Sequence, residues 1–148
     1  GREVGPDDVE PMNWAMAEAA ARMSATDLGL ALDQAHRFRR EVRAWWAAGW
    51  DLLVTPTLAE PPLPIGTIVN DVADPLAPVR RAGEWVAFTP PYNTTGQPAI
   101  SLPLHWTADG LPIGVQLVAD HGREDLLISV AARMEELLPW AHRRPPLD

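Results

Sequence analysis

The sequence contains no cysteine and no lysine among its 148 residues. Without cysteine there are no disulfides, no thiol catalysis and no cysteine-based metal sites, and the redox compartment is left undetermined. Without lysine, all 12 basic residues are arginine, whose side chain stays protonated in proteins. A mechanism that needs a titratable side-chain amine must therefore take it from outside these residues.

Long apolar runs and positive charge are also scarce. No run approaches the roughly 18 apolar residues that span a bilayer, and residues 1–10 lack a signal-peptide pattern, so we expect a cytoplasmic protein with no membrane partner. The net charge of −8 leaves no basic face for phosphates, which argues against nucleic acid as a partner. No glycine-rich phosphate-binding motif is present, and we expect no cofactor.

What is present suits a folded domain. Hydrophobic residues make up 47% and charged residues 22%, close to the averages for soluble domains, so disorder is disfavoured for the chain as a whole. Alanine-rich residues 11–23 predict a helix. Ser24 and Asp27 match a capping box, and apolar residues then recur at helical spacing up to Gly49, where a left-handed cap is expected.

Strands and a long loop dominate the remainder. Residues 51–56 read as a short buried strand, and residues 57–78 form a proline-rich loop that is too long for a compact domain unless it is functional or wraps a larger body. Residues 80–88 predict one or two helical turns that end before Pro90 and Pro91. Two strands joined at Asp109-Gly110 and a helix over residues 124–138 follow. The order indicates an α/β fold whose sheet is incomplete.

No catalytic centre is evident in the chain. A serine nucleophile needs a neighbouring base and a strained, glycine-flanked turn. The three serines are predicted to have other roles: Ser24 caps a helix, Ser101 lies in a strand and Ser129 lies on a helix. The four histidines show no metal-ligand spacing, so no metal site is predicted at His36, His105, His121 or His142.

The tryptophans offer two interpretations. Trp45, Trp46 and Trp50 are predicted to line a core or an interface. Trp85 precedes the proline-rich junction and belongs either to the core or to the wall of a pocket.

Four segments together resemble the C-terminal part of the amidase signature family: DLLVTPT (51–57), FTPPYNTTGQPAISLPLHW (88–106), DGLPIGVQLVA (109–119) and GREDLLISVAARMEE (122–136). Within the family, the second segment is most similar to that of bacterial amidases of the 6-aminohexanoate cyclic dimer hydrolase type. The resemblance implies a mixed β-sheet flanked by α-helices, incomplete without an N-terminal portion, with residues 1–148 as the C-terminal segment of a single domain.

The family hydrolyses carboxamide bonds with a Ser-Ser-Lys triad. The resemblance places that triad in the missing N-terminal portion, so this chain holds none of the catalytic residues. It implies substrate contact by Phe88, Thr89 and Tyr92, with Trp85 in the pocket wall. Arg123 stands where amidotransferase relatives carry an acid that binds the ammonium of glutamine, so glutamine is disfavoured and an anionic or neutral substrate is favoured.

Three residues are assigned to a structural turn that frames the pocket. They are Asn93, whose side chain can bond nearby backbone groups, Gly96 in a tight turn, and Pro98 at the entry of a strand. The expected partners are the N-terminal portion of the same enzyme and a small amide, and a homodimer is left open.

Two other functions stay open from the sequence. One is a fragment similar to the A subunit of a tRNA-dependent amidotransferase. The other is a non-catalytic module that binds a protein through the tryptophan- and proline-rich face between Trp45 and Trp85.

Overall fold

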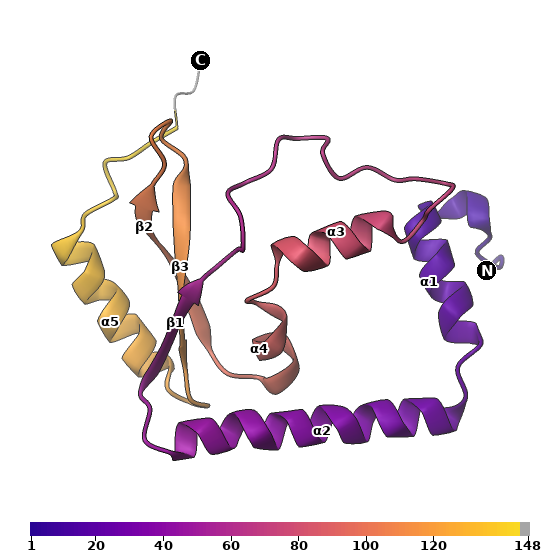
Figure 1. Cartoon of the computed structure of the whole chain (residues 1–148), viewed down its shortest axis with the longest axis horizontal. Helices are drawn as coiled ribbons and strands as arrows, with labels where there is room; N and C mark the ends of the chain where they lie inside the picture. The colour runs from indigo at the N-terminus through magenta and orange to yellow at the C-terminus, as the bar shows by residue number, and fades with distance from the viewer. Residues whose placement is uncertain (146–148) are drawn as a thin grey trace.

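The computed structural model describes residues 1–145 and contains a small sheet with helices on both sides (Figure 1). In chain order the elements are a short 3-10 turn η1 (Pro6–Asp8), α1 (Pro11–Ala21), α2 (Ala25–Ala47), β1 (Leu52–Pro56), α3 (Ala77–Trp85), α4 (Pro90–Thr95), β2 (Ala99–Trp106), β3 (Pro112–Ala119) and α5 (Glu124–Leu137). The arrangement confirms the predicted combination of helices and strands.

The sheet has the strand order β1-β3-β2, and both strand pairs are antiparallel. The predicted hairpin between β2 and β3 is confirmed, with Gly110 at φ +89° in its turn. The register shifts between Pro103 and His105, which agrees with the irregularity expected where proline removes a donor from an edge strand. Any parallel pairing of the expected mixed sheet therefore lies outside the described residues.

Helix α5 covers one face of this sheet (Figure 1). Leu102 of β2, Leu117 and Ala119 of β3, and Leu127 of α5 are buried together and form the core. Leu102 and Leu117 alternate along their strands with Ser101 and Gln116, so the side chains of these two polar residues point to the opposite face.

Helix α2 begins at the predicted capping box. The Ser24 amide donates to Asp27 Oδ2 at 2.8 Å, and the Asp27 amide donates to Ser24 Oγ at 3.1 Å. The Ser24 hydroxyl also donates to Asp27 Oδ2 at 2.7 Å, and this bond, followed by that from the Ser24 amide, lowers the pKa of Asp27. Only Trp46 is buried among the residues of α2, and Trp45 and Trp50 stack with ring centroids 5.5 Å apart. The helix thus leaves most of its surface uncovered.

Prolines also begin helices here. Pro90 and Pro91 occupy the first turn of α4, where a missing N–H costs nothing because first-turn amides have no intrahelical acceptor. The preceding helix α3 begins at Ala77 and ends at Trp85. The two prolines therefore separate two helices and start the second.

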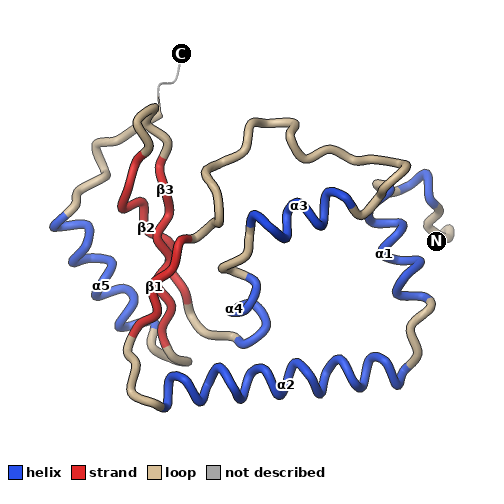
Figure 2. Tube along the Cα trace, viewed as in Figure 1, coloured by secondary structure: helices blue, strands red, loops and turns tan. Residues whose placement is uncertain are grey.

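The chain exposes far more surface than its mass requires. Its accessible area is 10,721 Å², whereas a folded monomer of this mass, 16.2 kDa, exposes about 7,500 Å². Figure 2 shows why: α1 and α2 extend away from the sheet, and residues 57–76 run as a long loop between β1 and α3. An excess of about 3,000 Å² is the scale of a large protein interface.

Candidate functional site

The face of the sheet opposite α5 carries a polar row. Thr55 of β1, Gln116 of β3 and Ser101 of β2 are register partners, so their side chains project from the same face at the same height. Gln116 is buried, Thr55 is half-buried and Ser101 is exposed. Polar side chains that alternate with apolar ones are typical of an antiparallel sheet with one open face, so the buried Gln116 is the member of the row that requires hydrogen-bond partners.

Gln116 ties this row to the connection between α3 and α4. Its side chain is buried, and Nε2 donates to Thr55 Oγ1 and to the Phe88 carbonyl, both at 3.0 Å. Both amide hydrogens are therefore used. The bonds hold the segment that precedes α4 against the middle of the sheet.

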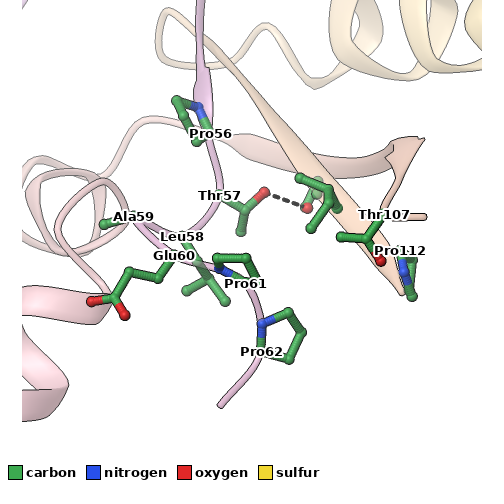
Figure 3. A pocket seen from close by; sticks show the side chains of 12 residues that line it. Pro56, Thr57, Leu58, Ala59, Glu60, Pro61, Pro62, Thr107 and Pro112 are labelled. Atoms are coloured by element: carbon green, nitrogen blue, oxygen red, sulfur yellow. Dashed lines mark hydrogen bonds between the residues drawn. The ribbon is translucent and has the colours of Figure 1, made fainter. Parts of the chain in front are cut away.

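A hydroxyl pair lies at the end of the polar row (Figure 3). Thr57 Oγ1 and Ser101 Oγ are 2.6 Å apart, and the Thr57 amide donates to the Gly114 carbonyl at 3.0 Å. A Cβ atom at Gly114 would lie 2.7 Å from each of the two hydroxyl oxygens, which is too close for any side chain. The hydroxyl pair therefore requires glycine at this position.

A cavity of about 530 Å³ opens beside the hydroxyl pair (Figure 3). Its walls are mostly apolar and come from the β1–α3 loop and the β2–β3 hairpin; they are Pro56, Leu58, Ala59, Pro61, Pro62, Pro112 and Ile113. Thr57, Ser101 and Thr107 contribute hydroxyls. Apolar walls with a few placed polar groups are typical of small-molecule sites.

The loop that forms this wall is attached to α3. Arg81 donates to both carboxylate oxygens of Glu60 at 2.9 and 2.8 Å, which lowers the pKa of Glu60. The Ala59 amide donates to the Trp85 carbonyl at 2.9 Å, and Trp85 Nε1 donates to the Glu60 carbonyl at 3.3 Å. These contacts hold Trp85 against Ala59 and Glu60, which line the cavity, although Trp85 itself does not line it.

The structure separates the residues assigned to substrate contact. Phe88, Thr89 and Tyr92 are half-buried near the start of α4, and burial raises the pKa of Tyr92. Arg123 lies at the opposite end of the sheet from the cavity, exposed at the start of α5, with Nε 3.3 Å from Asp125 Oδ1. The residues that line the cavity do not include any of the assigned five.

The turn residues flank α4. Gly96 has φ +85° and ends the helix in the left-handed conformation. Asn93 is exposed, and its side chain has no hydrogen-bond partner within residues 1–145. The Pro98 carbonyl accepts from the Ala119 amide at 3.1 Å and so extends the β2–β3 ladder.

Sequence reasoning missed the hydroxyl pair, Gly114 and the Gln116 anchor. The available signal was the spacing of these residues in otherwise apolar strands. Thr55 and Thr57 are two residues apart, as are Gly114 and Gln116, and residues two apart on a strand lie on the same face. Which strands would pair, and in which register, could not be read from that pattern.

Among residues 1–145 no serine side chain bonds to a histidine, and the one serine–carboxylate pair, Ser24 with Asp27, forms the cap of α2. Ser24 caps α2, Ser129 donates to the Asp125 carbonyl at 2.8 Å, and Ser101 bonds to Thr57. Over residues 1–145, no three His, Asp or Glu side chains gather to hold a metal ion. No helix in that range is long and apolar enough to cross a membrane.

A family profile described as Amidase matches residues 5–128. The chain belongs to the amidase family. It is 42% identical to the 6-aminohexanoate-cyclic-dimer hydrolase of Paenarthrobacter ureafaciens over 99% of this chain and 31% of that protein. It is 34% identical to an acylamidase of Rhodococcus erythropolis over 85% of this chain and 26% of that protein. This amidase-family chain thus spans about a third of the length of its curated relatives.

Solved structures agree with this assignment. The amidase-family chain superposes on the 6-aminohexanoate cyclic dimer hydrolase complexed with substrate with a TM-score of 0.91 and 42% identity, covering 98% of this chain and 31% of that one. The A subunit of a glutamyl-tRNA(Gln) amidotransferase from Thermotoga maritima shares the fold, with a TM-score of 0.59 and 24% identity over 94% of this chain and 29% of that one. The predicted resemblance and its branch are confirmed.

Proposed function

We propose that residues 1–148 are the C-terminal segment of an amidase-family hydrolase that cleaves carboxamide bonds. The polar row beside an apolar cavity carries this proposal, because it offers positioned hydroxyls without a base to activate them. The segment supplies a wall of the substrate pocket. The Ser-Ser-Lys triad comes from an N-terminal portion that covers the exposed surface.

In this proposal the cavity and α4 contact different parts of the substrate. The hydroxyls of Thr57 and Ser101 meet a polar atom of a bound amide, while the surrounding prolines contact its hydrocarbon part. Phe88 and Thr89, directly before α4, and Tyr92 within it approach the acyl group, and Trp85 stands between this segment and the cavity. Arg123 favours a neutral or anionic substrate through charge at long range only, given its place at the far end of the sheet.

The location of the nucleophile tests this proposal. The intact protein that carries residues 1–148 is treated with a serine-directed organophosphorus reagent, and the labelled peptide is identified by mass spectrometry. We expect one labelled serine outside residues 1–148, together with hydrolysis of a simple carboxamide and of the cyclic dimer of 6-aminohexanoate. A label on Ser101, or hydrolysis by the isolated 148-residue chain, would contradict the proposal.

Ser101→Ala in the intact protein is the matched control. It removes the one serine hydroxyl beside the cavity, so labelling should persist while KM for the carboxamide rises. An intact protein that transfers ammonia from glutamine would instead support an amidotransferase, and one with no labelled serine would support a non-catalytic binding module. The cytoplasmic location and the homodimer remain predictions.

A further inference from the structure

The C-terminal end of α4 is held by side chains from two distant parts of the chain. Arg39 of α2 donates from Nε to the Thr94 carbonyl at 2.6 Å. His121, in the loop between β3 and α5, has Nε2 2.9 Å from the Thr95 carbonyl. The last carbonyls of a helix lack partners within it, so both residues supply donors that α4 itself cannot provide.

The chemistry of these contacts is well defined. A carbonyl oxygen can only accept, so His121 donates from Nε2. Asp120 Oδ1 accepts the backbone amide of His121 at 2.8 Å, which fixes the backbone beside the ring. The positive charge of Arg39 is favoured at a helix C-terminus because the helix dipole is negative there.

The opposite end of the same segment is fixed as well. Gln116 donates to the Phe88 carbonyl, and Thr95 Oγ1 donates to the Pro91 carbonyl at 2.9 Å. The buried polar side chains of the described residues are Thr95, Gln97 and Gln116, and all three bond to or lie within residues 88–97. Gln97 Nε2 has no hydrogen-bond partner among the described residues, so the bonds of Thr95 and Gln116 are the ones that fix this stretch of backbone.

We propose that Arg39 and His121 are positioning residues that set the orientation of α4, and through it the place of Tyr92, in the substrate pocket. This inference rests on the proposed function, since Tyr92 matters only if α4 faces a substrate. Neither residue lines the cavity or is expected to touch a ligand. Their removal should therefore displace Tyr92 without affecting the chemistry of amide cleavage.

The test measures both position and binding in the intact protein. Tyr92 is replaced by 3-fluorotyrosine through site-specific incorporation, which gives one fluorine resonance at α4. Arg39→Met and His121→Leu should each shift this resonance and raise KM about tenfold, the effect of losing one hydrogen bond to a carbonyl of α4. The value of kcat should change less than twofold.

Conservative variants and a matched control separate positioning from general stability. His121→Gln and Arg39→Lys keep a nitrogen donor and should restore much of the native resonance and KM. Arg37→Met removes a neighbouring arginine of α2 that bonds to Asp33 on the same helix, and should leave both the resonance and KM unchanged. If Arg39→Met does not fold, Arg39→Leu, which also lacks a donor, is measured instead with the same expected outcomes.

Two results would overturn the inference. One is an unchanged fluorine resonance in Arg39→Met and His121→Leu, and the other is an equal shift in Arg37→Met. If the intact protein hydrolyses no amide, the proposed function fails, while the resonance still reports whether Arg39 and His121 orient α4.

Discussion

Replacing Gly114 with alanine adds a single methyl group but should destabilise the folded protein strongly. The added Cβ would lie 2.7 Å from Thr57 Oγ1 and from Ser101 Oγ, and 3.1 Å from Thr57 Cβ. Ordinary contact begins near 3.4 Å, so each hydroxyl must move by about 0.7 Å (3.4 − 2.7). Overpacking of this kind costs about 1–3 kcal/mol. Losing the hydrogen bond between the two hydroxyls adds about 0.5–1.5 kcal/mol.

The expected total is therefore about 1.5–4.5 kcal/mol of unfolding free energy. Urea unfolding of the intact protein, followed by tryptophan fluorescence, measures it. Gly29→Ala is the matched control, because Gly29 lies inside α2 with nothing within 4 Å of its Cβ position. That change should stabilise the helix by roughly 0.8–1 kcal/mol. A loss below about 0.5 kcal/mol for Gly114→Ala would refute the packing argument.

Two further predictions concern the core and Tyr92. Leu127→Ala should lower the free energy of unfolding in urea by about 2–5 kcal/mol, because Leu127 is buried against β2 and β3. Its control Ile128→Ala, at an exposed neighbour, should lower it by less than about 0.5 kcal/mol. Equal effects would contradict the assigned face of α5. Burial raises the pKa of Tyr92, the only tyrosine of the chain, so its phenolate absorbance should appear above the usual value of about 10. Because the folded pKa is the higher one, the associated stability is present below the unfolded value and is lost as pH rises toward the folded value. A titration of the folded chain that matches the denatured chain would contradict this.

Local features of the fold were predictable because they depend on neighbours in sequence. The capping box of Ser24 and Asp27 and the left-handed Gly49 and Gly110 are properties of a few adjacent residues. The hairpin followed from alternation around Asp109-Gly110. Local propensity predicted that Pro90 and Pro91 end a helix, and they also begin α4, because local sequence does not say on which side of a proline a helix continues.

The site was less predictable than the fold. Tyr92 and Phe88 were chosen through a family resemblance, whereas the cavity is formed where Thr57, Ser101 and Gly114 meet. Ser101 lies 44 residues from Thr57 along the chain. Only the pairing of both outer strands with β3 brings them to hydrogen-bonding distance.

The sequence by itself determined the class of elements, the family and the lack of a lysine base, because these depend on residue identity and short-range pattern. Tertiary structure alone decided which face of the sheet is polar, where the cavity opens and what holds α4. Those features arise from strand register and from contacts such as Arg39 with Thr94, which are 55 residues apart. Long-range contacts are set by the packing of whole elements, and no local pattern encodes them.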